Sequence, residues 1–377
     1  MSNDTDIAIV GAGIAGAALA HALAPHARVL LLEREAQPGL HSTGRSAAMF
    51  MESYGPPQAR ALTRASRAFY AEPPEGFADA PILSPRGALY VAWAAHAAAL
   101  DSTEADLRAT GTVVERLGPA EALARMPLLR DHTADHGALL GALWEPDAMD
   151  VDVHALHQGY LRGARRHGAA LWCDAELQQA SREAGGWTLT LADGRTLRAE
   201  RLVNAAGAWA DVVAERCGST QQGLQPKRRS AFTFEAPADL DCRGWPVTAA
   251  IDERWYVKPD AGQLLGSPAN ADPVVPHDVV AEELDIATAI HHIGEDTTLQ
   301  VRRPRHTWAG LRTFSRSGEL VIGHDANGLF WLAGQGGYGI QSAHGAALLA
   351  AALLQGVPPD DMLRAQGVQA AAMAPHG

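Results

Sequence analysis

A glycine-rich turn between two short apolar segments near the N-terminus limits the folds open to this chain most strongly. Residues 6–10 (DIAIV) and 28–33 (RVLLLE) have the continuous apolar character of buried parallel strands. Between them lies GAGIAG at residues 11–16, followed by an alanine- and leucine-rich stretch typical of a helix. This order predicts a β–turn–α–β unit, the start of a Rossmann-like domain.

The three glycines of this turn match the GxGxxG fingerprint of dinucleotide-binding proteins. Gly11 permits a tight turn, Gly13 lets a pyrophosphate approach the backbone at the helix N-terminus, and Gly16 allows close helix–strand packing. Glu33 ends the second strand, where a carboxylate accepts hydrogen bonds from ribose hydroxyls. Such an acid disfavours a 2′-phosphate, so NADP is a poor candidate.

A second glycine-rich turn, GQGGYGIQ at residues 334–341, distinguishes between FAD and NAD. It lies within residues 330–354, which are predicted as a strand, a turn and a long apolar helix. A nicotinamide domain has no need of this turn. A flavin does, because reduced flavin carries negative charge near N1 and a helix N-terminus stabilises an anion there.

The rest of the chain alternates helical and hairpin patterns. Residues 58–70 and 154–168 are predicted helices, while residues 186–207 and 254–267 read as β-hairpins, the first with an Asp-Gly turn. The nucleotide-type features lie at the N-terminus, in the middle and near the C-terminus, with hairpin material between them. This dispersal predicts two interleaved domains.

Composition excludes several classes of partner. The 377 residues carry a formal net charge of −12 and no long basic run, so neither nucleic acid nor an anionic membrane surface is expected as a partner. The cysteines Cys173, Cys217 and Cys242 lack metal-ligand spacing, and the histidines form no metal set, so no metal site is predicted. The N-terminal apolar run is too short and glycine-rich for a membrane span, and we expect a soluble, cytoplasmic protein.

Eight sequence blocks together carry a family resemblance. In chain order they are GAGIAG, the terminal acid of RVLLLE, STGRSAA, LVNAAGAWAD, LQPKRRSAF, WYVKPDAGQLLGSPANADP, TWAGLRTF and GQGGYGIQ. They resemble the FAD-dependent D-amino-acid oxidase/glycine oxidase superfamily over essentially the whole chain, and are most similar to its bacterial D-arginine dehydrogenases. The resemblance implies a mixed α/β fold, in which a Rossmann-like FAD domain of the glutathione-reductase type is interleaved with a substrate domain built on a mixed β-sheet.

The resemblance and the spread of motifs suggest limits for these domains. The FAD domain is expected over residues 1–50, 140–215 and 310–377, and the substrate domain over 51–139 and 216–309. FAD is expected to bind non-covalently, since no cysteine lies in a block typical of flavin attachment. The residues that the resemblance places at the cofactor are Gly11, Gly13, Ile14, Ala15, Gly16, Glu33, Arg34, Ser42, Thr43, Arg45, Ser46, Ala47, Ala48, Leu177, Ala206, Gly207, Trp209, Gly310, Gly336, Gly337, Tyr338, Gly339, Ile340 and Gln341.

The resemblance also implies a clamp for a substrate carboxylate, made by Arg229, Arg312 and Tyr256. Chemistry supports it independently, because paired arginine forks hold a carboxylate bidentately. The carbonyl of Gly337 matches the acceptor of the substrate amine, and Tyr54 matches a residue beside the site. Gln341 and Glu253 also match residues around the site, Glu253 on a covering loop.

The chain departs from the D-arginine dehydrogenases at three positions. Met49 replaces a histidine, Met51 a threonine, and Ala88 a glutamate that would pair with the substrate guanidinium. A guanidinium without an acidic partner in a dry pocket pays a large desolvation penalty. We therefore expect a preference for apolar side chains, unless the two methionines merely pack beneath a loop.

Three functions stay open at this point. The first is oxidation of a D-amino acid to its imino acid, by hydride transfer from the α-carbon to flavin N5, followed by hydrolysis to keto acid and ammonia. The second is oxidation of a secondary or cyclic amine such as sarcosine, proline or pipecolate, and the third is a non-catalytic flavin subunit that relays electrons. The partners expected are a small amino acid or amine and an electron acceptor, which is a quinone, a carrier protein or O2.

Overall fold

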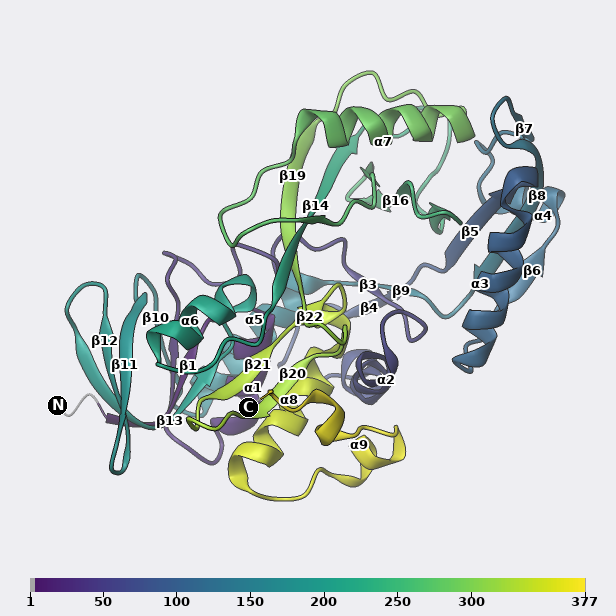
Figure 1. Cartoon of the computed structure of the whole chain (residues 1–377). Helices are drawn as coiled ribbons and strands as arrows, with labels where there is room; N and C mark the ends of the chain where they lie inside the picture. The colour runs from purple at the N-terminus through teal and green to yellow at the C-terminus, as the bar shows by residue number, and fades with distance from the viewer. Residues whose placement is uncertain (1–3, 377) are drawn as a thin grey trace.

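Two lobes share three β-sheets in the computed structural model, which describes residues 4–376 (Figure 1). In the first lobe, lower left in the figure, helices cover an eight-stranded sheet. In the second, an eleven-stranded sheet lies beneath one long helix. A small three-stranded sheet consists of β3 (Met49–Phe50), β9 (Met149–Val151) and β4 (Leu83–Pro85).

The first sheet has a parallel centre and an antiparallel margin. Its strands are β10 (Ala170–Trp172), β2 (Val29–Leu32), β1 (Asp4–Val10), β13 (Thr196–Asn204), β12 (Gly186–Leu191) and β11 (Leu177–Glu183), with β21 (Phe330–Ala333) beside β13 and β20 (Val321–His324) beside β21. Strands β10, β2, β1, β13 and β21 run parallel, as buried apolar strands favour.

Four helices pack on or beside this sheet: α1 (Ile14–Leu23), α2 (Pro57–Ala71), α5 (Val153–Arg166) and α8 (Gly339–Gln355). Small residues allow them to approach closely. A Cβ at Gly345 of α8 would lie 2.5 Å from the carbonyl oxygen of Leu62 in α2, so only glycine fits this contact. The result is one continuous apolar core between the sheet and these helices.

The second sheet is mixed. Its strands are β22 (Gln335–Gly336), β19 (His306–Phe314), β14 (Gln225–Phe234), β17 (Gln263–Ser267), β16 (Tyr256–Asp260), β15 (Val247–Ala250), β5 (Ala88–Trp93), β8 (Gly137–Glu145) and β6 (Glu115–Leu117), with β18 (Asp272–Pro273) on β14 and β7 (His132–Thr133) on β8. All pairs are antiparallel except β15 with β5. The remaining helices are α3 (Ala97–Ala109), α4 (Pro119–Arg125), α6 (Ala210–Arg216), α7 (Glu283–Asp296) and α9 (Asp361–Ala365), with short 3₁₀ turns at Ala94–His96, Gly207–Trp209 and Ala370–Met373.

The mixed α/β fold expected from the sequence is confirmed, and both predicted hairpins form, as β12–β13 and β16–β17. The domain limits stay a prediction. The predicted limits at 139/140 and 309/310 fall inside strands β8 and β19, which pair with β5 and β14 in the second sheet. Helix α2 lies in the predicted substrate domain but packs on α8 of the predicted FAD domain. Residues 1–3 and 377 of the predicted FAD domain lie outside the described residues.

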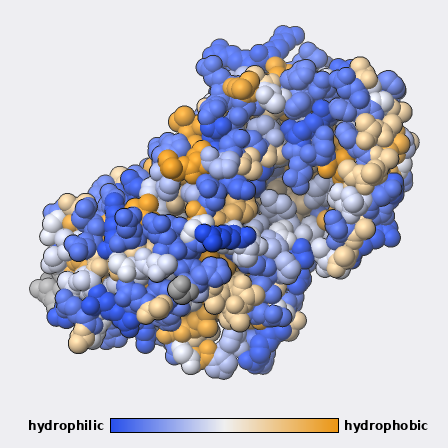
Figure 2. Space-filling view, viewed as in Figure 1, coloured by the Kyte–Doolittle hydropathy of each residue, from blue (hydrophilic) through white to orange (hydrophobic). Residues whose placement is uncertain are grey.

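Within residues 4–376, no helix is both long enough and apolar enough to cross a bilayer. The face drawn in Figure 2 is mostly hydrophilic, and its hydrophobic residues form small separate patches.

Candidate active site

One elongated cavity of about 510 Å³ runs between the two lobes, from the glycine-rich turn to the second sheet. Every residue predicted for cofactor or substrate contact lines it except Gly16 and Tyr338. The fold therefore brings to one place segments that are scattered along the chain.

Backbone geometry at the first turn depends on two glycines. Gly11 has φ +102°, and a Cβ there would lie 2.4 Å from the carbonyl oxygen of Ala205. A Cβ at Gly16 would lie 1.9 Å from the carbonyl oxygen of Gly11, so Gly16 supports the turn from beneath and does not line the cavity. A Cβ at Gly13 would meet only the Thr43 hydroxyl, at 3.2 Å, which leaves its cavity face open for a ligand.

Glu33 is buried at the end of β2 and is already bound to the turn. Its Oε2 accepts from the backbone N–H of Ala12 at 3.1 Å, and its Oε1 accepts from that of Glu35 at 3.1 Å. Burial raises the pKa of this carboxyl above its usual range, and these two hydrogen bonds oppose the shift. Each oxygen keeps a further lone pair, so the predicted ribose contact stays open.

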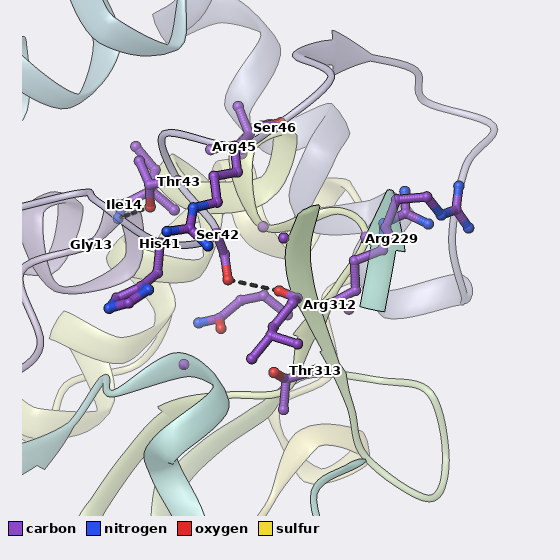
Figure 3. Close-up of a pocket in the computed structure, with 18 of the residues that line it drawn as sticks. Gly13, Ile14, His41, Ser42, Thr43, Arg45, Ser46, Arg229, Arg312 and Thr313 are labelled. Atoms are coloured by element: carbon purple, nitrogen blue, oxygen red, sulfur yellow. Dashed lines mark hydrogen bonds between the residues drawn. The ribbon is translucent and has the colours of Figure 1, made fainter. Parts of the chain in front are cut away.

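The small residues at 42–48 connect the turn to strand β19 (Figure 3). The Thr43 hydroxyl accepts from the N–H of Ile14 at 3.0 Å, and the Ser42 hydroxyl donates to the carbonyl of Leu311 at 2.6 Å. Arg45 binds the Asp278 carboxylate at 2.6 Å and the carbonyl of Val279 at 2.9 Å. This segment therefore spans from the cofactor turn to the substrate sheet.

Aromatic and cationic side chains surround the outer end of the cavity. The Arg34 guanidinium lies 5.1 Å from the centre of the Trp209 ring, and the His41 ring lies 4.7 Å from the same side chain. Leu177 completes this wall. His41, which none of the sequence motifs marks, also lines the cavity.

The second predicted turn closes the inner end. Gly336 has φ +52°, and helix α8 begins at Gly339. Tyr338 is buried behind the turn, where its hydroxyl donates to the carbonyl of Gly318 at 2.6 Å, and so it does not face the cavity. Gln341 is also buried and holds the neighbouring segment: its amide accepts from the N–H of Met51 at 3.2 Å and donates to the carbonyl of Met51 at 3.0 Å.

Two arginines face the cavity from paired strands. Arg229 lies on β14 opposite Gly310 of β19, and Arg312 lies two residues further along β19 (Figure 3). Burial, followed by the charge of Arg312, lowers the pKa of Arg229 below its usual range. Among the described residues no carboxylate forms an ion pair with either arginine; Arg229 donates to the carbonyl of Asn270 at 2.5 Å.

Gly337, Tyr54, Tyr256 and Glu253 line the same cavity as this arginine pair. A Cβ on Gly337 would lie 2.8 Å from the Arg312 guanidinium carbon and 3.0 Å from the Tyr54 hydroxyl, so this glycine opens space beside both. Tyr256, Tyr54 and Glu253 each raise the pKa of Arg229, against the effects of burial and of Arg312. The site is therefore a half-buried, doubly cationic pocket that suits one small anion.

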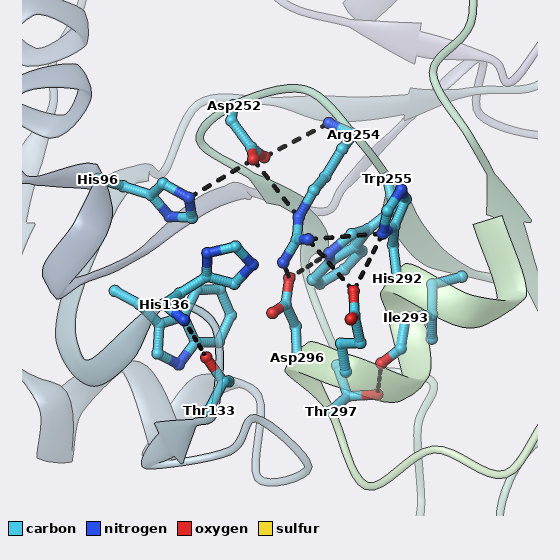
Figure 4. A network of polar contacts seen from close by, with 12 residues as sticks. His96, Thr133, His136, Asp252, Arg254, Trp255, His292, Ile293, Asp296 and Thr297 are labelled. Atoms are coloured by element: carbon cyan, nitrogen blue, oxygen red, sulfur yellow. Dashed lines mark hydrogen bonds and ion pairs between the residues drawn. The ribbon is translucent and has the colours of Figure 1, made fainter. Parts of the chain in front are cut away.

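The loop that carries Glu253 is anchored from behind (Figure 4). Arg254 donates to Asp296 at 2.5 Å and pairs with Asp252 at 3.4 Å, while the Trp255 indole N–H donates to Asp296 at 2.7 Å. Glu253 itself has φ +60°, an unusual backbone conformation for a residue with a side chain. The flanking residues hold this acid at the cavity, where it lines the wall.

An apolar wall lies along the same cavity. Its lining residues are Met49, Met51, Ala88, Val247, Tyr90 and Tyr256, and Ala148 packs against them without lining the cavity. The predicted pocket residues Met49, Met51 and Ala88 all line the cavity. Sequence reasoning missed Ser53, Tyr90 and the acid behind them, Glu145. The one available signal was strand alternation, which places Tyr90 on the same face as Ala88.

These residues fit an elongated dinucleotide. The glycine turn leaves its cavity face open, the small residues at 42–48 and Gly337 leave a smooth wall, and no cysteine of the described chain lines the cavity. A flavin would lie between the segment 42–48 and the turn before α8, close to the arginine pair.

Comparison with known proteins identifies the family and supports the fold. A family model described as FAD dependent oxidoreductase (DAO) matches residues 6–353. Glycine oxidase from Geobacillus kaustophilus superposes with a TM-score of 0.81 and 24% identity over 94% of this chain and 95% of that one. Iminodiacetate oxidase from Chelativorans sp. BNC1 gives 0.80 and 23% over 98% of both chains, and L-proline dehydrogenase from P. horikoshii gives 0.81 and 18% over 96% of both. At these identities the solved structures support the fold alone.

A curated relative matches a shorter region. Mitochondrial dimethylglycine dehydrogenase from Mus musculus is 28% identical over 132 residues, which are 34% of this chain and 15% of that protein. The match thus spans a small part of the length of that relative.

Proposed function

This chain belongs to the FAD-dependent oxidoreductase (DAO) family, and on that premise we propose that it oxidises a D-amino acid to the imino acid. The observation that carries the proposal is the pair Arg229 and Arg312, two half-buried cations without a carboxylate partner among the described residues. A substrate carboxylate supplies the missing anion. A flavin subunit that only relays electrons has no need of such a pair.

The side chains orient the substrate for reaction. Arg229 and Arg312 hold the carboxylate from one side, and Tyr54 and Tyr256, which line the same cavity, offer their hydroxyls to the same group. The Gly337 carbonyl accepts from the amine, which reacts in its neutral form because its lone pair stabilises the developing imine. These contacts leave the α-hydrogen as the group directed at the cofactor.

FAD, when bound, accepts that hydrogen as a hydride at flavin N5. The protein residues exclude water from the reacting side through the apolar wall of Met49, Met51, Ala88 and Val247. The product imine hydrolyses to a keto acid and ammonia after release.

The side-chain preference follows from the same wall. Met49, Met51 and Ala88 present sulfur, methylene and methyl groups, which favour D-methionine, D-leucine or D-phenylalanine over D-arginine. The D configuration and the relationship to D-arginine dehydrogenases rest on the sequence blocks quoted above.

A secondary or cyclic amine is the second candidate. Met49 offers no strong hydrogen-bond partner to an amine, so the site has room for an N-alkyl group or a ring. Several proteins of similar fold are named for such substrates, including L-proline dehydrogenase and iminodiacetate oxidase.

The test is anaerobic mixing of the FAD-loaded protein with D-amino acids, L-amino acids, secondary amines and 2-hydroxy acids, followed by the visible flavin absorbance. At pH 6 we expect apolar D-amino acids to bleach the flavin faster than D-arginine. Faster bleaching by D-arginine removes the apolar preference, and faster bleaching by sarcosine or proline selects the second candidate. A flavin that no amino acid or amine reduces overturns the proposal. Aerating the reduced samples, with and without a quinone, then identifies the electron acceptor.

A further inference from the structure

A buried carboxyl group lies directly behind the apolar wall of the substrate pocket. Glu145 ends strand β8 and is only 1% exposed. It pairs across the sheet with Ala88 of β5, so both side chains project from the same face. Because Ala88 ends at its Cβ, it does not cover the carboxyl, and the cavity-lining residues Ser53 and Tyr90 contact it instead.

These two hydroxyls are the hydrogen-bond partners of Glu145. Ser53 Oγ lies 2.9 Å from each carboxyl oxygen, and Tyr90 Oη lies 3.4 Å from Oε2. In the part of the chain that the structure describes, no cation pairs with this acid: Arg67 pairs with Glu52, and Lys258 pairs with Asp150. A buried carboxylate without a cation is costly, so its protonation state responds readily to its surroundings.

The charged and titratable groups that face Glu145 do not supply a positive charge. Its own loop contributes Asp147, the segment after β3 contributes Glu52, and both acids favour its neutral form. Burial raises the pKa of Tyr90 on β5, and Glu145, Tyr54 and Glu253 on the covering loop raise it further. Among the described residues no cation is thus recorded as acting on Glu145, and a cationic substrate side chain would supply that charge.

We propose that Glu145 sets the charge preference of the side-chain pocket, acting as a specificity-determining residue through the hydroxyls of Ser53 and Tyr90. As a carboxylate it only accepts hydrogen bonds, so both hydroxyls must point toward it and turn their oxygen lone pairs to the cavity. That wall binds an ammonium or another donor at the end of the substrate side chain. As a carboxylic acid Glu145 donates to Ser53 instead, and the pocket then favours apolar side chains.

This inference rests on the proposed function and refines it. The pocket prefers substrates with apolar side chains at low pH and substrates with basic side chains at high pH. Burial raises the pKa of Glu145 to about 7, a shift that its hydrogen bonds to Ser53 and Tyr90 reduce. The anionic fraction then rises from about one tenth at pH 6 to about nine tenths at pH 8. The change in preference should therefore occur near neutral pH.

The test measures binding of two acids that lack an α-amine and cannot be oxidised as amino acids are: hexanoate and 6-aminohexanoate. They match the skeletons of norleucine and lysine, and both are titrated into FAD-loaded protein while the flavin absorbance is followed. We expect the ratio of the two dissociation constants to shift toward 6-aminohexanoate by about tenfold between pH 6 and pH 8. In Glu145→Gln the ratio should stay constant at its low-pH value.

Two further variants keep the proposal falsifiable if Glu145→Gln does not fold. Ser53→Ala and Tyr90→Phe retain the carboxyl but remove its link to the cavity, and each should reduce the pH-dependent shift. Glu115→Gln is the matched control, since it removes an exposed glutamate from the neighbouring strand β6 and should behave as the wild type.

The outcomes separate the two proposals. If both acids bind with a ratio that does not change with pH, or if Glu145→Gln keeps the shift, the role of Glu145 is overturned while the carboxylate clamp stands. If neither acid perturbs the flavin at any pH, the clamp itself is wrong and the role of Glu145 falls with it.

Discussion

The two ends of the cavity are built in different ways. At the cofactor end, polar groups of the protein bond to one another: Glu33 caps the turn, Thr43 caps the N–H of Ile14, and Gly11 is required by backbone space. At the substrate end, the charge of Arg312 acts on Arg229, and within the described residues no carboxylate forms an ion pair with either arginine. The polar groups of the cofactor end therefore stabilise the fold itself. The arginines of the substrate end lack a carboxylate partner, which a bound ligand would supply.

This difference predicts how each end responds to substitution. Changes at the cofactor end should alter folding and FAD content together, whereas changes at the substrate end should alter activity and leave both intact.

The largest effect is expected from Gly11→Ala. Its Cβ would lie 2.4 Å from a backbone oxygen at a φ that side chains disfavour, so we expect loss of bound FAD and about 2–4 kcal/mol of stability. Flavin absorbance of the purified protein and its melting temperature measure this. Gly294→Ala is the control: nothing lies within 4 Å of its Cβ, and alanine in helix α7 should be neutral or slightly stabilising. A Gly11→Ala protein with normal colour and melting temperature would contradict the comparison.

The second effect concerns the substrate end. Arg312→Met should lower kcat/KM about 100- to 1000-fold, because a charge-assisted bidentate contact is lost, while FAD content and melting temperature stay unchanged. Arg312→Lys should recover part of the activity, since lysine keeps the charge but not the fork. Steady-state kinetics with the best amino acid from the panel provides the measurement. A change below threefold would place the carboxylate elsewhere.

A third prediction compares the two buried glutamates. Glu145 lacks the backbone N–H bonds of Glu33, and burial raises its pKa to about 7 in the folded protein. The folded state then binds the proton more tightly than the unfolded chain, so the stability from Glu145 is complete below its unfolded pKa of about 4.5 and decreases until pH reaches about 7.

Between pH 5.5 and pH 8 this loss is about 2 kcal/mol in the wild type and absent in Glu145→Gln. Urea unfolding of both proteins at the two pH values checks it. Equal pH dependence in the two proteins would mean that Glu145 titrates normally.

The smallest effect is expected where the two ends join. Asp278→Asn removes the exposed partner of Arg45, but the arginine keeps the carbonyls of Val279 and Ala309. We expect a change of less than about 0.5 kcal/mol, and less again in high salt. Melting temperatures at two salt concentrations measure this, and loss of FAD would show that the ion pair holds the cofactor segment.

Local patterns were sufficient for the cofactor end. The glycine turn, the acid at the end of β2 and the β12–β13 hairpin depend on residues near one another in sequence, so spacing and alternation predict them. The tail after Gln366 is rich in alanine, and its composition alone does not indicate that it packs on the rest of the chain. In the structure Met373 is buried, and the His376 N–H donates to the Gln222 side chain at 2.7 Å, a contact that composition does not reveal.

The substrate end was harder to predict, since its residues meet through strand pairing between distant segments. The resemblance pointed to Arg229 and Arg312, but no motif marks Ser53, Tyr90 or Glu145. Glu145 reaches the pocket only because β8 pairs with β5 in a register that sets it opposite Ala88. Gly16 and Tyr338 were expected at the cofactor, but both lie behind the cavity wall, because motif membership does not decide which side of a turn a residue faces.

By itself the sequence determined the dinucleotide turn, the mixed α/β class and the residue types available for a carboxylate clamp. The first two follow from short-range rules on backbone space and apolar periodicity, whereas the clamp was implied by the family resemblance. Tertiary structure alone decided which charges remain unpaired and which acid lies behind the substrate wall. Both depend on the register of strands far apart in the chain, and a one-residue shift of that register would turn Glu145 to the opposite face of the sheet.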